Sequence, residues 1–186
     1  MSRETPFQTV GPFFHYALPY SGGETLVDAG TLGQRIVIEG TVFDGSGVPV
    51  PEALVEIWQA NASGRYNHPG DQRDVPLDPA FDGFGRTPTD GAGRYAFTTV
   101  KPGRVPGPNR TWQAPHVLVG LLGRGLLTRL VTRVYFDDEP STADDPILTL
   151  VPEGRRSTLV ARRVEGGRYR FDIVLQGPGE TVFFDI

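Results

Sequence analysis

The chain has no cysteine among its 186 residues. A disulfide framework, a thiolate nucleophile and a zinc ribbon are therefore excluded. Apolar segments of membrane-spanning length are also lacking, and the N-terminal segment MSRETPFQT contains no apolar signal core. We expect a cytoplasmic protein that makes no membrane contact.

An excess of positive charge is missing as well. The formal net charge is −4, so no basic surface favours nucleic acid as a partner. The common short enzyme motifs are absent too, because the chain has no GxSxG, no HExxH, no phosphate-binding loop and no dinucleotide fingerprint. None of the enzyme classes that depend on these motifs is indicated.

Glycine and proline are abundant, with 24 and 17 residues, and they are scattered between hydrophobic segments. This distribution is typical of many turns between short strands and not of a disordered tail. We predict an all-β protein, an antiparallel β-sandwich with an extended N-terminal arm and long loops. Residues 1–186 are expected to form a single domain, with the arm at 1–34 and the core at 35–186.

Apolar alternation and turn residues locate the strands of this core. They predict strands within 35–44, 53–61, 89–103, 116–122, 128–136 and 168–176. Tyr95 and Phe97 are expected to share one face of the third of these strands. Residues 61–86 form a long polar loop, and long ordered loops in compact domains are often functional. Only residues 155–164 could form a helix, and it would be short.

The segment TWQAPHVL at residues 111–118 raises the question of a metal site. Side chains at i and i+2 of a strand lie on the same face, so a histidine at position 118 would stand beside His116. That position is Leu118. From the residues alone, His116 is either a core histidine or half of an incomplete site, and Tyr66 is a loop aromatic.

Three ordered segments carry a resemblance to a known family: GTVFDGSGVPVPEALVEIWQANASGRYNH, LDPAFDGFGRTPTDGAGRYAFTTVKPG and WQAPHV. Together they resemble the intradiol ring-cleaving dioxygenases, and the resemblance extends from Thr5 to Ile186. It implies a β-sandwich core and a mononuclear non-haem ferric iron, held by two tyrosines and two histidines. The C-terminal segments RVYFDDE and YRFDIVLQGPGETVFFDI narrow the resemblance to the alpha-type chain of members built from two homologous chains.

The resemblance allows the iron ligands to be compared one at a time. Tyr66, in the Gly-Arg-Tyr motif, matches the first tyrosine, and His116 matches the first histidine. Val105 replaces the second tyrosine and Leu118 replaces the second histidine. An arginine that follows the tryptophan in catalytic chains is Gln113 here. We therefore predict that Tyr66 and His116 are vestigial, and that this chain holds no metal and no catalytic residue.

The resemblance further implies that Fe(III) is bound by a homologous beta chain and that this chain supplies part of the pocket wall. The residues predicted to bind substrate are those of the arm segment, Thr9, Val10, Gly11 and Pro12, and Arg124, whose guanidinium could meet a carboxylate. The expected reaction of the (αβ)n hetero-oligomer is intradiol cleavage of protocatechuate by O2 to 3-carboxy-cis,cis-muconate, in the β-ketoadipate pathway of aromatic catabolism. This chain alone would be inactive.

Two alternatives remain open. The first is a non-catalytic β-sandwich interaction module that has lost both iron and ring cleavage. The second is an autonomous catechol dioxygenase, which Val105 and Leu118 disfavour.

The arm also carries the aromatic residues Phe7, Phe13, Phe14 and Tyr16. They have no obvious place in a sandwich core and would form an exposed apolar patch on the isolated chain. We expect the beta chain to bury them.

Overall fold

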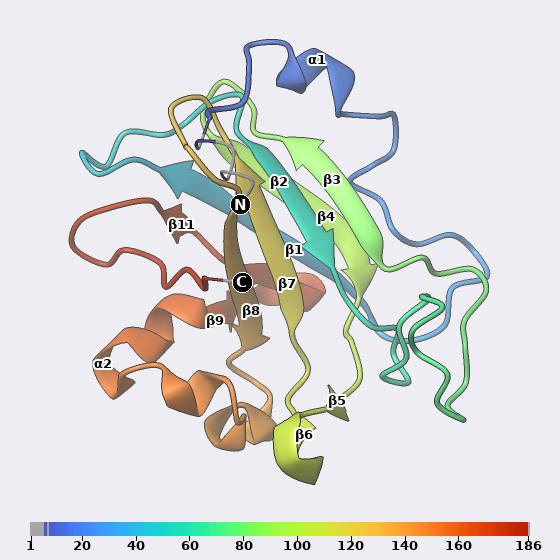
Figure 1. Cartoon of the computed structure of the whole chain (residues 1–186). Coiled ribbons are helices and arrows are strands. Elements are labelled where there is room, and N and C mark those ends of the chain that lie inside the picture. Colours follow the sequence, from blue (N-terminus) through green and yellow to red (C-terminus); the bar gives the residue numbers. More distant parts are fainter. Residues whose placement is uncertain (1–5, 7, 186) are drawn as a thin grey trace, which may run out of the picture.

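Strands predominate in the computed structural model, which describes residue 6 and residues 8–185 (Figure 1). The strands are β1 (Arg35–Phe43), β2 (Leu54–Trp58), β3 (Phe84–Pro88), β4 (Arg94–Val100), β5 (Val105–Pro106), β6 (Trp112–Gln113), β7 (Val117–Leu122), β8 (Leu130–Phe136), β9 (Val160–Arg163), β10 (Arg168–Arg170) and β11 (Ile173–Val174). The helices are α1 (Phe14–Ala17), α2 (Glu153–Arg156) and the short 3-10 segments η1 (Pro108–Arg110), η2 (Pro140–Asp144), η3 (Leu148–Leu150), η4 (Ser157–Leu159) and η5 (Glu165–Gly167).

Most strands belong to one curled sheet in the order β11-β1-β10-β9-β8-β7-β2-β3, with β4 paired to β1. Strands β5 and β6 form a separate two-stranded ladder. The all-β class is confirmed, but a purely antiparallel sandwich is not. β1 pairs in parallel with β10 and β11, and β8 pairs in parallel with β9. Parallel pairing needs a crossover, and here the long C-terminal segment returns to both strands.

The curl brings two halves of the sheet face to face around the main core. One half contributes side chains from β1 and β4, including Ile36, Ile38 and Phe97, and the other contributes side chains from β2, β7 and β8. In β4, Tyr95 and Phe97 are both buried, as predicted from the alternation of the strand. The strands β2, β7 and β8 are thereby anchored in the core, and the long loop at 61–83 follows β2.

A close backbone approach explains why the predicted strand at 168–176 is divided into β10 and β11. A Cβ atom on Gly40 would lie 1.7 Å from the carbonyl oxygen of Phe171, so β1 needs glycine at this point. The same oxygen accepts a hydrogen bond from the Tyr95 hydroxyl at 2.6 Å. Next to it, the carboxylate of Asp172 accepts from the amide of Thr41 at 2.9 Å. At the break between β10 and β11, hydrogen bonds involving side chains thus replace part of the backbone pairing with β1.

Several elements differ from the sequence-based predictions, and β5 and β6 lie outside every predicted strand. β3 occupies the end of the predicted loop at 61–86, because the segment FGRTP is added to the sheet by pairing with β2 and shows no apolar alternation of its own. Only the first part of 155–164 is helical, since β9 follows at Val160 and pairs with β8. The arm contains the helix α1, which its proline- and glycine-rich sequence did not indicate.

The arm lies partly on its own sheet. The amide of Leu26 donates to the carbonyl of Thr98 at 2.9 Å, and the amide of Thr98 donates to the carbonyl of Glu24 at 2.8 Å. Near α1, Phe13 and Tyr16 are 75% and 77% exposed, whereas Phe14 is only 7% exposed. The prediction of an exposed aromatic patch is therefore wrong for Phe14, whose side chain is buried by residues of the same chain. Phe7 lies outside the described residues.

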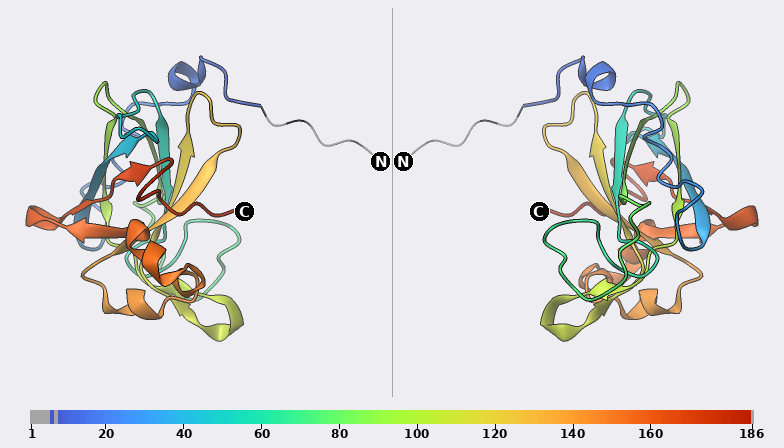
Figure 2. Two further views of the ribbon diagram at one scale, coloured as in Figure 1. Left: turned by 90° about the vertical axis from the view of Figure 1, so that its left-hand side faces the viewer. Right: turned by 90° about the vertical axis from the view of Figure 1, so that its right-hand side faces the viewer.

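The two ends of the strands β2, β7 and β8 carry different parts of the chain. Figure 2 shows α1 and the preceding arm beside the loop between β7 and β8 at one end, and β5 and β6 at the opposite end.

Among the residues that the structure describes, no helix is long and apolar enough to cross a membrane.

Candidate functional site

The predicted functional residues fall into two separate regions, at opposite ends of β7. His116 directly precedes this six-residue strand, and the turn that contains Arg124 directly follows it. A strand rises by about 3.3 Å per residue, so the two regions are roughly 20 Å apart. The vestigial ligand positions and the predicted substrate-binding residues of one chain therefore cannot share a pocket.

The first region is a cavity of about 740 Å³, within the size range of small-molecule sites. Its lining residues are Trp58, Tyr66, His68, Gly70, Asp71, Arg73, Val105, Pro106, Gln113, His116 and Arg133. Three of the four positions compared with the iron ligands thus face one space. The fourth, Leu118, lies in register between Trp58 on β2 and Arg133 on β8.

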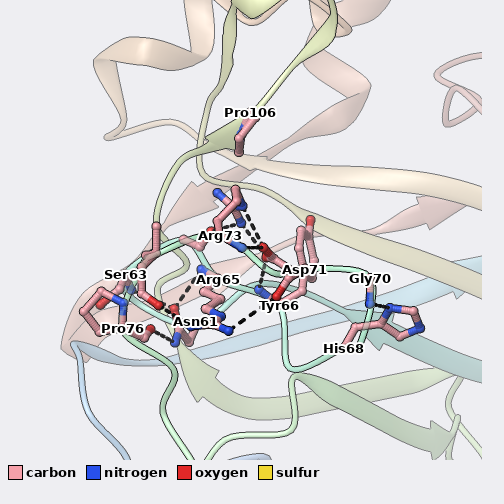
Figure 3. A network of polar contacts seen from close by, with 12 residues as sticks. Asn61, Ser63, Arg65, Tyr66, His68, Gly70, Asp71, Arg73, Pro76 and Pro106 are labelled. Carbon is pink, nitrogen blue, oxygen red and sulfur yellow. Dashed lines mark hydrogen bonds and ion pairs between the residues drawn. The ribbon is translucent and has the colours of Figure 1, made fainter.

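Tyr66 is positioned by the long loop that follows β2. The side-chain oxygen of Asn61 accepts from the amides of Ser63 and Arg65 at 3.0 and 2.9 Å, and its side-chain nitrogen donates to the carbonyl of Pro76 at 2.9 Å (Figure 3). Gly64 has φ of 79°, and a Cβ atom there would lie 2.0 Å from the carbonyl oxygen of Arg104. Asn61 and Gly64 therefore fix the turn that leads into Tyr66.

An ion pair fixes the other side of the same loop. The carboxylate of Asp71 accepts from the Tyr66 amide at 2.9 Å and pairs with Arg73 at 2.5 Å (Figure 3). Arg73 also donates to the carbonyl of Gly64 at 2.7 Å. The hydrogen bonds from Arg73 hold the pKa of Asp71 well below its usual range. Asp71 is thus a permanent anion whose charge is balanced by Arg73.

The ring of Tyr66 forms an aromatic wall with Trp58. The two rings stack with centroids 5.8 Å apart and planes 16° from parallel. Burial raises the pKa of the Tyr66 hydroxyl, against the opposing charges of Arg133 and Arg73. The side chain is therefore a neutral phenol, and its hydroxyl makes no hydrogen bond to any described residue.

His116 is buried and held in one tautomer. Its Nδ1 atom lies 2.7 Å from the carbonyl oxygen of Ala114, which can only accept, so Nδ1 carries the proton and Nε2 keeps a lone pair. Burial, together with the nearby charge of Arg133, lowers the pKa of His116 to about 4. At neutral pH the ring is therefore an uncharged hydrogen-bond acceptor at the wall of the cavity.

Arg133 is the residue of this cavity that sequence reasoning missed. It extends from β8, and its Nη1 atom donates to the side-chain oxygen of Gln113 at 2.6 Å. It reaches the Tyr135 hydroxyl at 3.5 Å, and it pairs with no carboxylate among the described residues. The sequence feature that could have revealed it is a single arginine within the largely apolar strand LVTRVYF. Arg133 places an uncompensated positive charge beside Tyr66 and His116.

The second region joins the arm to the turn after β7. The amide of Gly125 donates to the hydroxyl of Thr9 at 3.0 Å. Val10 lines a small hollow with Leu122, Leu126 and other residues of the loop between β7 and β8. The structure thus brings the predicted residue Thr9 next to the turn of Arg124.

The remaining predicted residues of the second region are at the surface. Gly11 and Pro12 are exposed. The Arg124 side chain is 61% exposed and pairs with Glu52 at 2.6 Å. Glu52 was not among the predicted residues, because it precedes β2 and is distant from Arg124 in the sequence. Arg124 is therefore an exposed cation that already has an acidic neighbour.

Fold and site together define a β-rich domain with a small-molecule cavity whose tyrosine–histidine pair is incomplete as a metal site. A family model described as dioxygenase matches residues 9–177, and the chain belongs to this intradiol dioxygenase family. The chain is 44% identical to the protocatechuate 3,4-dioxygenase alpha chain of Burkholderia cepacia, over 99% of this chain and 98% of that relative. It is 48% identical to the beta chain from the same organism, over 81% of this chain and 68% of that relative.

A solved structure supports the fold. Catechol 1,2-dioxygenase from Acinetobacter sp. ADP1 is similar with a TM-score of 0.63 and 25% identity, over 84% of this chain and 58% of that one.

The family consists of non-haem iron enzymes, and the residues of this cavity do not fit such an iron. Tyr66 and His116 supply two donors, while Val105 and Leu118 are apolar. No group of three or more His, Cys, Asp or Glu side chains that could hold a metal ion occurs among the described residues. The charge of Arg133 also disfavours a second cation at the same place.

Proposed function

We propose that this chain is the alpha subunit of protocatechuate 3,4-dioxygenase and is active only together with an iron-bearing beta chain. The observation that carries the proposal is the incomplete donor set at the cavity, with apolar Val105 in its lining, apolar Leu118 in register between the lining residues Trp58 and Arg133, and a positive charge on Arg133. The comparison of lengths agrees with this assignment, because the chain spans 98% of the related alpha chain but 68% of the related beta chain. Fe(III) would then reside on the beta chain, in an (αβ)n assembly.

The contribution of this chain to catalysis would be part of the pocket wall around the iron of the partner. The hydrogen bond from the Gly125 amide to the Thr9 hydroxyl joins the segment from Thr9 to Pro12 to the turn of Arg124. Gly11 allows the backbone to approach a flat ring closely, and Pro12 fixes the direction of the chain. The guanidinium of Arg124 would bind the carboxylate of protocatechuate while the partner chain opens the ring.

Co-expression with the homologous chain of the same organism tests the proposal. The purified complex should take up oxygen with protocatechuate and contain about one iron per αβ pair, whereas each chain alone should be inactive. Tyrosinate–Fe(III) charge transfer should colour the complex red-brown and leave this chain colourless. Oxygen uptake by the partner chain alone at the rate of the complex would contradict the proposal and favour a non-catalytic interaction module.

A further inference from the structure

We propose that the cavity lined by Tyr66, His116 and Arg133 is a metal-free binding site for a hydroxybenzoate, a small aromatic carboxylate that carries a ring hydroxyl. This site lies at the opposite end of β7 from the Thr9–Arg124 surface, so it is distinct from the catalytic pocket proposed above. The inference depends on the side chains of this chain alone and not on its assembly with a partner.

The walls of the cavity suit a flat ring. Trp58 and Tyr66 present a stacked aromatic pair, and Val105 and Pro106 add apolar surface to the same cavity. The cavity volume of about 740 Å³ is ample for one benzene ring with its substituents. Aromatic side chains favour offset or edge contacts with another ring, so this arrangement selects planar ligands over branched ones.

The charge of the cavity selects an anion. Arg73 and Asp71 neutralise each other at 2.5 Å, and His116 is uncharged. Among the described residues, the guanidinium of Arg133 contacts neutral partners, the side chains of Gln113 and Tyr135 and the ring of Phe184. A half-buried cation whose partners are neutral can bind a carboxylate. A guanidinium does so by donating two parallel hydrogen bonds.

Two further groups select a hydroxyl on the ring. Nε2 of His116 has a lone pair, because Nδ1 donates to the carbonyl of Ala114. The Tyr66 hydroxyl can donate as well as accept. A phenol on the ligand can therefore donate to His116 and accept from Tyr66 while its carboxylate meets Arg133. An apolar cavity would need none of these groups, and an iron site would need four donors, two of which are missing here.

Fluorescence makes a sharp test possible, because the chain has only two tryptophans, Trp58 and Trp112. Trp112 is 52% exposed and outside the cavity lining, so Trp112→Phe leaves Trp58 as the single reporter within the cavity. The full-length Trp112→Phe chain is titrated with 4-hydroxybenzoate in the presence of EDTA. We expect saturable quenching without any metal, and at least about tenfold weaker binding of the uncharged 4-hydroxybenzamide.

The variants are compared in the Trp112→Phe background. Arg133→Gln should weaken 4-hydroxybenzoate binding at least about tenfold, because a charge-assisted hydrogen bond is lost. Tyr66→Phe keeps the stacked ring and should weaken binding by only a few fold. Arg162→Gln removes an exposed arginine of β9 that is not part of the cavity lining, and it should leave the affinity unchanged.

Several outcomes would overturn the inference. These are absence of saturable quenching, equal binding of the acid and the amide, equal binding by wild type and Arg133→Gln, or binding that appears only after ferric ion is added. If Arg133→Gln fails to fold by circular dichroism, the acid–amide comparison in the parent chain still decides. Because the experiment needs no partner chain, its failure is distinguishable from a failure of the co-expression assay.

Discussion

Arg124 and Glu52, 72 residues apart in the sequence, form a 2.6 Å ion pair on the surface that also contains Thr9. Both side chains are substantially exposed, at 61% and 45%. An exposed pair of this kind contributes only about 0–1 kcal/mol. Glu52 therefore orients the guanidinium of Arg124 without making it unavailable to a substrate carboxylate.

Removal of the Glu52 charge should strengthen substrate binding in the αβ complex. Under the proposed role of Arg124, Glu52 would compete with the substrate carboxylate for its guanidinium, so Glu52→Gln should lower KM for protocatechuate by up to about fivefold, the equivalent of about 1 kcal/mol. The value of kcat should change little, because the pair is remote from the reacting oxygens. Steady-state oxygen uptake measures both constants. A higher KM would show instead that Glu52 is needed to position Arg124.

Arg124→Ala should raise KM for protocatechuate by about 10- to 150-fold, the loss of a charge-assisted contact of roughly 1.5–3 kcal/mol. The rate with catechol, which lacks the carboxylate, should remain nearly unchanged, and kcat should fall less than kcat/KM. Arg124→Lys should restore only part of the affinity, since a point charge replaces a two-pronged donor. Equal losses with both substrates would indicate a role in the subunit interface.

The isolated chain should bind no stoichiometric iron after purification and exposure to ferric salts. Tyr66 and His116 supply too few donors, and Arg133 adds a repelling charge. Elemental analysis of the folded chain measures the iron content. A value of about one tightly held iron per chain would show that other residues supply the ligands.

Deletion of residues 1–16 should abolish association with the beta chain, because the arm exposes apolar rings that a partner would cover. The structure refines this experiment. Phe13→Ala together with Tyr16→Ala should weaken association and leave the stability of the isolated chain unchanged, since both rings are exposed. Phe14→Ala is the contrasting variant, and it should lower the melting temperature because Phe14 is buried. Co-purification of the truncated chain at full yield would contradict the prediction.

The stability of the chain should decrease in acid through His116. The folded pKa of about 4 is below the ordinary value of 6.5, so the unfolded state binds more protons between these two values. The free energy of unfolding should therefore fall as the pH is lowered from 6.5 to 4, with a contribution of up to about 3 kcal/mol. Urea unfolding of wild type and His116→Gln at several pH values measures the difference. Identical pH dependence of both proteins would refute this role of His116.

The sequence alone determined the chemistry that is present and the chemistry that is missing. Val105 and Leu118 lack donor atoms whatever the fold, so the incomplete ligand set could be recognised from residue identity and motif order. Apolar residues bounded by turn residues likewise located β1, β4 and β7, because each of these strands has a buried face. The edge strand β3 escaped detection, since its place depends on pairing with β2 and not on a pattern of its own.

Only the tertiary structure decided where the charges lie. Arg133 faces the cavity because β8 pairs with β7 in the register that sets it opposite Leu118, and no local sequence pattern contains that register. Glu52 meets Arg124 because β2 and β7 are antiparallel neighbours whose ends coincide. Phe14 is buried and Phe13 is exposed, although the two rings are neighbours in the sequence. Long-range strand pairing, which no local sequence pattern contains, placed the guanidinium of Arg133 in the cavity beside Tyr66 and His116, the two residues that match iron ligands of the catalytic chains.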